Sequence, residues 1–393
     1  MQYRLDERSG NELSVLGFGC MRFPRGISGI ALEKADGLIL SAVEAGVNYF
    51  DTAYLYGGSE AALGTVLAKH NIRNKVHIAT KLPIANCRAA ADFDKYFDIQ
   101  LKALQTDYID YYLMHNINSL AQWHEKCDLG ICEWIRNKKS EGAFKQIGFS
   151  FHGAHDEFDK LLDAYDWDFC QIQYNYSNEN YQAGVSGLRK AASKHIPVII
   201  MEPLLGGKLA GGLTREAVEV FRKANADDSP AAWGLRWLWN QPEVTVVLSG
   251  MNKAAQLEDN LSAAEAAKAN MLTKHEKAAY EKVIKIFKST DKVPCTGCSY
   301  CMPCPNGVNI PACFASYNAS YTHGRITSLM MYITSTAANR NRKALVSNCM
   351  SCGKCQQHCP QKIEISRELK GVKRRMEPFW FSPAMKILRK FVK

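Results

Sequence analysis

The chain has 393 residues, 47% of them hydrophobic and 22% charged, and its formal net charge is +10. This composition is typical of a soluble globular protein and excludes a wholly disordered chain. No run of 18 uncharged apolar residues occurs, and the opening segment MQYRLDERSG lacks the apolar stretch of a secretory signal. We therefore expect a cytoplasmic protein without a transmembrane segment.

The positive charge is concentrated at the C-terminal end. Residues 361–393 hold ten Lys or Arg and three Glu, so +7 of the net +10 lies there. The rest of the chain is close to neutral, and we therefore expect no nucleic-acid partner. The last residues carry an apolar stripe that includes Met385, Leu388 and Val392, which predicts an amphipathic helix. Two roles stay open for it: packing on the protein's own surface, or contact with an anionic membrane or a redox partner.

Eight short β-branched or aromatic segments alternate with longer helical patterns between about residues 14 and 250. The expected strands are 14–18, 47–51, 76–80, 109–114, 145–150, 170–174, 197–201 and 244–249. One helix is expected to begin at Pro230, with Ser229 as its N-cap. Eight strands that alternate with helices favour an α/β fold of the (β/α)8 barrel type. The alternative is an open doubly wound sheet, but the first expected strand is not followed by the motif G-x-G-x-x-G.

Composition divides the chain into three parts. The expected barrel covers residues 1–290 and ends near the segment STDKVP. A cysteine-rich, mostly helical domain is expected over residues 291–365, and a basic tail over residues 366–393.

Ionisable side chains stand where three of the expected strands end. These are Asp51, Lys81 and His115, and Tyr56 lies in a loop five residues after Asp51. Each alone could be structural, but the ends of barrel strands gather on one face, where catalytic groups lie. A lysine ammonium lowers the pKa of a nearby tyrosine from about 10, and a carboxylate holds the lysine in place. With a histidine to orient a carbonyl group, the set predicts a proton donor for a carbonyl that receives hydride.

The segments DTAYLYGGSE, ATKLP and LMHN resemble the catalytic segments of the aldo/keto reductase superfamily. The resemblance covers roughly residues 1–290. It implies an NAD(P)H-dependent enzyme that interconverts a carbonyl and an alcohol. It also implies that Tyr56 is the general acid/base, that Lys81 and Asp51 tune it, and that His115 orients the substrate.

Four further segments resemble the family's cofactor-binding segments: QIQYN, IGFSFH, MEPLLGGKL and LSGMNKAAQLEDN. By this resemblance the residues that bind the nicotinamide dinucleotide are Ser150, Gln171, Pro203, Leu204, Gly206, Lys208, Gly250, Lys253, Gln256 and Asn260. The chain departs from the family pattern at Phe151, Met201 and Asn252, where asparagine, tyrosine and arginine are usual. NADPH is the expected cofactor. NADH stays open, because Asn252 stands where arginine is usual and an arginine binds a 2′-phosphate better than the ammonium of the neighbouring Lys253 does.

Nine of the 14 cysteines lie between residues 295 and 359. They include two runs, C-x2-C-x2-C-x2-C-P and C-x2-C-x2-C-x3-C-P, that resemble the bacterial ferredoxin pattern for [4Fe–4S] clusters. The resemblance implies two clusters with the ligands Cys295, Cys298, Cys301, Cys304, Cys349, Cys352, Cys355 and Cys359. In two-cluster ferredoxins the fourth cysteine of each run ligates the other cluster, so Cys359 would join the first run and Cys304 the second. Zinc is the alternative, although it normally uses two separated pairs. Cys313 is expected to be a core residue.

The leading hypothesis is therefore an oxidoreductase that acts on a small carbonyl or alcohol and exchanges electrons with a partner protein through two clusters. A hydride carries two electrons and a cluster normally one, so a flavin stays open as a further cofactor, although the sequence has no obvious flavin motif. The alternative is an iron–sulfur electron-transfer protein whose barrel is a scaffold or binds a different redox cofactor. The sequence does not indicate the substrate.

Overall fold

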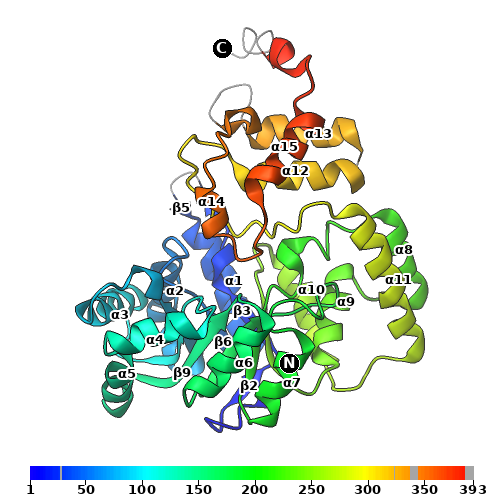
Figure 1. Cartoon of the computed structure of the whole chain (residues 1–393). Helices are drawn as coiled ribbons and strands as arrows, with labels where there is room; N and C mark the ends of the chain where they lie inside the picture. Colours follow the sequence, from blue (N-terminus) through cyan, green and yellow to red (C-terminus); the bar gives the residue numbers. More distant parts are fainter. Residues whose placement is uncertain (27–28, 323, 337–343, 386–393) are drawn as a thin grey trace. The chain divides into compact units, whose positions relative to one another are not determined.

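The computed structural model describes residues 1–26, 29–322, 324–336 and 344–385 (Figure 1). The chain forms two compact units. The first consists of Met1–Leu204 and Ala231–Thr273, and the second of Leu205–Pro230 and Lys274–Lys393. This division differs from the expected boundary near residue 290, because Leu205–Pro230 and helix α11 (Lys274–Thr290) both belong to the second unit.

The first unit is built on a closed barrel of eight parallel strands. Their order is β10-β11-β12-β3-β6-β7-β8-β9, and β9 pairs with β10 to close the circle. The strands are β3 (Leu16–Gly19), β6 (Tyr49–Asp51), β7 (His77–Leu82), β8 (Ile109–Met114), β9 (Phe144–Phe151), β10 (Phe169–Gln173), β11 (Val198–Met201) and β12 (Val244–Ser249). The predicted (β/α)8 barrel is confirmed, and every barrel strand overlaps an expected one.

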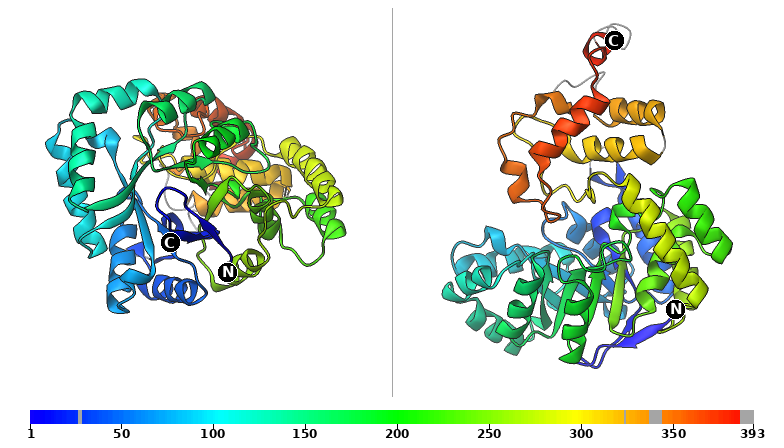
Figure 2. Two further views of the ribbon diagram at one scale, coloured as in Figure 1. Left: turned by 90° about the horizontal axis from the view of Figure 1, so that it is seen from below. Right: turned by 45° about the vertical axis from the view of Figure 1, so that its right-hand side comes forward.

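Helices of the first unit lie around these strands (Figure 2). They are α1 (Leu32–Glu44), α2 (Ser59–Lys69), α3 (Ala91–Leu104), α4 (Leu120–Asp128), α5 (Ile131–Ser140), α6 (His155–Ala164), α7 (Gly184–Ser193), α9 (Pro230–Trp239) and α10 (Ala254–Glu265). Helix α9 begins at Pro230, as the sequence predicts. Short 3-10 turns connect elements along the whole chain: η1 (Cys20–Arg22), η2 (Arg73–Lys75), η3 (Ile84–Asn86), η4 (Leu205–Gly207) and η6 (Val346–Asn348).

Strand side chains alternate between the barrel interior and the layer beneath the helices. The interior cluster consists of Leu13, Tyr49, Ala79, Tyr111, Leu113, Phe169, Ile199, Val246 and Leu248. Residues at the intervening positions, such as Phe50, Tyr112 and Phe149, pack with the helices in the larger outer cluster. This alternation determines which side chains near the strand ends face the interior.

The sequence did not predict the N-terminal hairpin. Strand β1 (Tyr3–Leu5) pairs antiparallel with β2 (Glu12–Ser14), and the expected strand 14–18 is divided between β2 and β3. Leu13 of β2 belongs to the barrel interior cluster, so the hairpin covers one end of the barrel (Figure 2). A second short hairpin joins β4 (Arg25–Gly26) and β5 (Gly29–Ile30).

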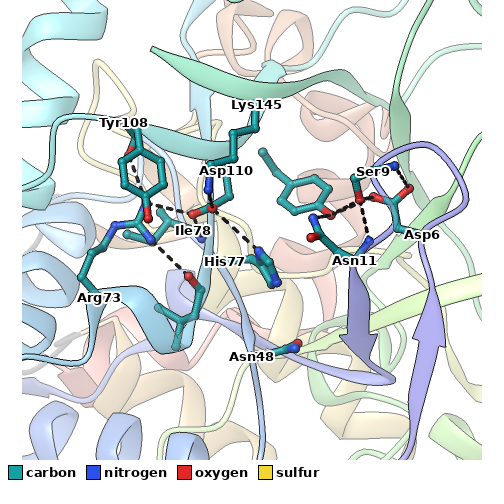
Figure 3. Close-up of polar contacts among 12 residues, drawn as sticks. Asp6, Ser9, Asn11, Asn48, Arg73, His77, Ile78, Tyr108, Asp110 and Lys145 are labelled. Atoms are coloured by element: carbon teal, nitrogen blue, oxygen red, sulfur yellow. Dashed lines mark hydrogen bonds and ion pairs between the residues drawn. The ribbon is translucent and has the colours of Figure 1, made fainter. Parts of the chain in front are cut away.

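Charged and polar groups hold together the strand beginnings (Figure 3). Asp110 of β8 accepts a hydrogen bond from the backbone N–H of Ile78 at 3.0 Å, and it pairs with Arg73 at 2.8 Å and with Lys145 at 3.1 Å. Burial acts to raise the pKa of Asp110, but His77 and these partners lower it to about 2. The carboxylate therefore stays ionised and links three consecutive strand regions at this end of the barrel.

The second unit is helical. Its helices are α8 (Arg215–Ala224), α11 (Lys274–Thr290), α12 (Ile310–Thr322), α13 (Arg325–Ser335), α14 (Lys354–Gln357) and α15 (Ile365–Met376). Its core includes Cys313, which is buried as expected. Leu369, Val372 and Met376 of α15 lie in the same core, although residue 366 is the expected start of the basic tail. Met385 is also buried there, whereas Leu388 and Val392 of the predicted stripe lie outside the described residues.

Among the described residues, no helix is both long and apolar enough to cross a membrane.

We expect Gly64→Ala to destabilise the barrel. Helix α2 approaches α3 at Gly64, where an added Cβ would lie 2.5 Å from the carbonyl carbon of Leu104 and 2.6 Å from the carbonyl oxygen of Ala103. Because backbone atoms cannot rotate away, we expect a loss of about 1–3 kcal/mol in the free energy of unfolding. Chemical unfolding followed by tryptophan fluorescence measures it. The control Gly37→Ala, with no atom within 4 Å of its added Cβ, should be neutral or stabilising. Equal losses in both variants would contradict this explanation.

Candidate active site and cysteine clusters

Lys81 and Asp51 form a buried ion pair at the carboxyl ends of β7 and β6. The Lys81 Nζ donates to both carboxylate oxygens of Asp51 at 2.7 Å and to the carbonyl oxygen of Thr52 at 2.8 Å. Lys81 is 1% and Asp51 4% exposed. Burial lowers the pKa of Lys81, and Asp51 opposes that effect. The three hydrogen bonds therefore fix the position of the ammonium and support its charge.

Tyr56 and His115 lie beside this ion pair. The Lys81 Nζ is 4.9 Å from the centre of the half-buried Tyr56 ring. The His115 ring is 5.9 Å from the Tyr56 ring and nearly perpendicular to it. Burial, followed by the Lys81 cation and His152, lowers the pKa of His115 well below its usual range. The structure thus brings the four residues together, with His115 as a neutral imidazole.

A buried polar network, which the sequence did not predict, lies behind Lys81. The Glu60 Oε1 accepts hydrogen bonds from Thr80 Oγ1 at 2.5 Å and from Gln100 Nε2 at 2.6 Å. Gln100 also donates to the carbonyl oxygen of Lys81 at 3.1 Å and accepts from the Tyr112 hydroxyl at 2.7 Å. Burial raises the pKa of Glu60. The sequence contained one indication of this network, because Gln100 is a polar residue on the otherwise apolar face of α3.

Two residues predicted to bind the nicotinamide, Ser150 and Gln171, are Cα partners on β9 and β10. The Gln171 Nε2 donates to Asp51 Oδ2 at 2.8 Å, and the Ser150 Oγ accepts from the backbone N–H of Asn116 at 2.8 Å. Both therefore lie at the level of the ion pair. Phe151, where the family usually has asparagine, is buried in the outer cluster with its ring 5.1 Å from that of Phe158.

The predicted adenosine segment surrounds the start of α10. The Asn260 Nδ2 donates to Ser249 Oγ at 2.8 Å, and the Gln256 Oε1 accepts from the backbone N–H of Asn252 at 2.9 Å. Lys253 immediately precedes the helix and is exposed. At Gly250 an added Cβ would lie 3.1 Å from the Arg22 side chain. Arg22 is a neighbour of this segment that the sequence did not predict.

The predicted pyrophosphate residues are divided between the two units. Pro203 and Leu204 belong to the first, and Gly206 and Lys208 to the second. Lys208 forms an ion pair with Asp291, and its Nζ donates to the carbonyl oxygen of Val293 at 2.9 Å. Gly206 has φ +69°, and an added Cβ would lie 2.1 Å from the Thr296 carbonyl oxygen. In this structure the loop therefore contacts both the start of the first cysteine run and the segment just before it.

The eight predicted cluster ligands lie around two cavities of the second unit. One cavity is lined by Cys295, Cys298, Cys301 and Cys359. The other is lined by Cys304, Cys349, Cys352 and Cys355. Each cavity thus combines three cysteines of one run with the fourth cysteine of the other run, which is the arrangement that crossed ligation requires.

The surroundings of the cavities suit a cluster held by thiolates. Ile310, Phe314 and Ile363 line the first cavity together with its cysteines. Burial, followed by the neighbouring cysteines, raises the pKa of the Cys301 thiol to about 12. Iron ions would supply the positive charge that allows such crowded thiols to ionise. Within the described ranges, no three His, Cys, Asp or Glu side chains are arranged to hold a single metal ion.

The barrel and its four-residue site define an oxidoreductase. A family model described as the aldo/keto reductase family matches residues 15–279, and one described as a 4Fe-4S dicluster domain matches residues 294–364. The chain belongs to the aldo/keto reductase family and carries a C-terminal 4Fe-4S dicluster domain, as the sequence predicted.

Curated relatives match the barrel part of the chain. The uncharacterized oxidoreductase YrpG of Bacillus subtilis is 25% identical over 308 residues, which cover 67% of this chain and 91% of the relative. The NADH-specific methylglyoxal reductase of Escherichia coli is 26% identical and covers 57% of this chain and 81% of its own. Among solved structures, aldo-keto reductase AKR11C1 from Bacillus halodurans in its holo form has a TM-score of 0.60 at 23% identity, over 72% of this chain and 96% of that chain. The likeness to the solved structure supports the fold.

His152, which follows β9, should make folding stability depend on pH. Burial lowers its pKa to about 4, against about 6.5 for an unfolded histidine. The unfolded chain therefore binds more protons between these values, and the folded state loses stability as the pH falls through them. The difference corresponds to about 3 kcal/mol. His152→Gln should flatten the pH dependence of urea unfolding between pH 6.5 and 4, whereas the exposed control His124→Gln should not. An unchanged slope in His152→Gln would refute the assignment.

Proposed function

We propose that the barrel interconverts a carbonyl and an alcohol with a nicotinamide dinucleotide as hydride carrier and Tyr56 as general acid/base. The observation that carries this proposal is the buried Lys81–Asp51 pair with Tyr56 and His115 beside it. A scaffold would not need an ammonium held by three hydrogen bonds next to a tyrosine.

A bound nicotinamide dinucleotide would supply the hydride for reduction. In that direction the Tyr56 hydroxyl donates a proton to the carbonyl oxygen. The Lys81 ammonium, 4.9 Å from the ring, stabilises the phenolate that remains. Asp51 keeps the ammonium charged and in place despite its burial. Neutral His115 orients the carbonyl oxygen by donating a ring N–H. In the direction of oxidation, the Tyr56 phenolate accepts the proton of the alcohol.

Names of two relatives support a small carbonyl substrate. They are the methylglyoxal reductase of Escherichia coli and a 6-dehydroglucose reductase of Novosphingobium aromaticivorans, which is 26% identical over 275 residues. We propose NADPH as the cofactor. NADH is the second candidate, because Asn252 stands where arginine is usual and the relative from Escherichia coli is named as NADH-specific.

For the second unit we propose two [4Fe–4S] clusters that exchange electrons with a redox partner protein. The two four-cysteine cavities support this proposal. No disulfide links cysteines in the described part of the chain, which favours a reducing compartment, and we propose the cytoplasm. The alternative, in which the barrel serves only as a scaffold for electron transfer, predicts that no nicotinamide dinucleotide binds.

Tyr56→Phe should reduce carbonyl reduction by about 10²–10⁴-fold, because it removes the proton donor and leaves the ring in place. Steady-state reduction of a panel of aldehydes and ketones under anaerobic conditions measures this effect. Nucleotide binding, followed by the fluorescence of the reduced nicotinamide, should persist.

The control for this experiment is Tyr54→Phe, two residues away, whose ring packs against Tyr96 at 5.0 Å. It should retain activity. Near-full activity of Tyr56→Phe would refute the assignment of the general acid. Failure of the wild-type protein to bind either nucleotide would favour the scaffold alternative.

Cys304→Ser should alter the cluster held by Cys349, Cys352 and Cys355, because Cys304 lines that cavity. Electron paramagnetic resonance of the reduced protein, after anaerobic reconstitution to about eight irons per chain, should show the same cluster altered in Cys304→Ser and in Cys349→Ser.

The control Cys313→Ala changes a buried cysteine that lines neither of the two cavities and should leave both signals intact. If Cys304→Ser instead matches the spectrum of Cys295→Ser, each run ligates its own cluster and the crossed arrangement is wrong.

A further inference from the structure

Lys208, one of the residues predicted to bind the pyrophosphate, makes its polar contacts within the second unit. It belongs to Leu205–Pro230, the part of that unit that follows β11 in the chain. Its ammonium forms an ion pair with Asp291 and donates a hydrogen bond to the carbonyl oxygen of Val293 at 2.9 Å. The side chain of Lys208 is 18% exposed and that of Asp291 10%. The ammonium is therefore largely buried, and its partners lie just before the first cysteine run.

The carbonyl oxygen of Val293 accepts hydrogen bonds from three donors. Besides the Lys208 ammonium, these are Asn318 Nδ2 at 2.6 Å and the backbone N–H of Cys295 at 2.8 Å. Asn318, in α12, also accepts a hydrogen bond from the backbone N–H of Val293 at 3.0 Å. A carbonyl oxygen has two lone pairs, so three donors use its full capacity. The peptide group two residues before Cys295, a predicted cluster ligand, is therefore held firmly in place.

The segment that carries Lys208 also contacts the residue after Cys295. Gly206 has φ +69°, and an added Cβ at this position would lie 2.1 Å from the carbonyl oxygen of Thr296. Two backbones can approach this closely only because glycine has no side chain. Cys295 is thus held from both sides, through Val293 by Lys208 and through Thr296 by Gly206.

Lys208 and Asp291 also determine the charge beside the first cysteine run. Asp291 lies four residues before Cys295 in the chain and accepts a further hydrogen bond from Asn318 Nδ2 at 2.9 Å. Burial raises the pKa of Asp291, and the Lys208 ammonium opposes this effect. Removal of either partner would leave one uncompensated charge, and salt screens a largely buried charge much less than an exposed one.

We propose that Lys208 and Asp291 are positioning residues of the first cluster, the one expected in the cavity that Cys295 lines, and that they set its reduction potential. This inference rests on the proposed [4Fe–4S] clusters. The reduction potential of such a cluster depends on the net charge, the hydrogen bonds and the solvent exposure around it. The proposal assigns Lys208 to the cluster rather than to the pyrophosphate of the nucleotide.

A redox titration of the anaerobically reconstituted protein, followed by electron paramagnetic resonance, tests the role of the two charges. Lys208→Met leaves the Asp291 carboxylate unpaired, so the first cluster should become harder to reduce. Asp291→Asn leaves the ammonium unpaired, so the same cluster should become easier to reduce. We expect opposite shifts of about tenfold in the ratio of reduced to oxidised cluster, or about 59 mV for one electron. The double variant should return close to the wild-type potential, and the cluster that Cys349→Ser alters should not shift in any of these variants.

Two further variants are the controls. Lys292→Met removes an exposed ammonium that donates instead to the carbonyl oxygen of Ser289 at 2.7 Å, and it should leave the potential unchanged because water and salt screen an exposed charge. Lys208→Arg keeps the positive charge and should keep a potential close to that of the wild type. Shifts of the same sign in Lys208→Met and Asp291→Asn, as a purely structural role would give, would overturn the proposal. So would the absence of any shift.

Iron content separates this inference from the proposed function. A wild-type protein that binds no iron after reconstitution would show that the clusters and this inference are both wrong. About eight irons per chain, with equal potentials in all variants, would refute the inference and leave the proposed clusters intact. If Lys208→Met fails to assemble the first cluster, it should bind about four irons, and Lys208→Arg should restore the rest.

Nucleotide titration tests whether Lys208 binds the pyrophosphate instead. The fluorescence of reduced nicotinamide should give the same Kd for the wild-type protein and for Lys208→Met. A Kd raised about tenfold or more, as the loss of a hydrogen bond between charged groups would cause, together with unchanged potentials, would assign the ammonium to the nucleotide and overturn the proposal.

Discussion

The chemistry proposed for the barrel depends on a lysine ammonium that is kept charged where water does not reach it. Taking an ammonium out of water is costly, and burial alone would drive Lys81 toward its neutral form. Asp51 offsets this cost with two hydrogen bonds, and the carbonyl oxygen of Thr52 accepts the third. All the donors of Lys81 are thereby used within the protein. Tyr56 therefore lies near a positive charge whose position is fixed.

The same ion pair explains why the surrounding network is polar and buried. Asp51 accepts a further hydrogen bond from Gln171, and Gln100 fixes the Lys81 backbone from behind. Gln100 is held in turn by Glu60, whose carboxyl group would be costly to bury without partners. Each of these buried polar groups needs a hydrogen-bond partner, so the network extends from the barrel interior to α2 and α3. A substitution in this network would displace the ammonium without touching the substrate.

The strands and the four residues of the candidate site could be predicted because both depend on local pattern. Buried parallel strands appear as short apolar runs, and Asp51, Lys81 and His115 stand directly at their ends. Contacts between residues that are far apart in the sequence cannot be recognised from a local pattern. The bond from Gln171 to Asp51 and the ion pair of Lys208 with Asp291 each join segments more than 80 residues apart. The antiparallel N-terminal hairpin was missed because its strands have only three residues each.

The spacing of the cysteines alone does not determine which of them share a cavity. The apolar core of the second unit does. The two runs are separated by 44 residues, so their sequence leaves open whether each run closes its own site. In the structure Ile310, at the start of α12, lines both cavities. It belongs to the same apolar core as Ile365 and Leu369 of α15, the helix that follows the second run. Because this core holds the two runs against one another, the fourth cysteine of each run reaches the cavity of the other. Packing of the intervening helices therefore determines which thiols share a cavity.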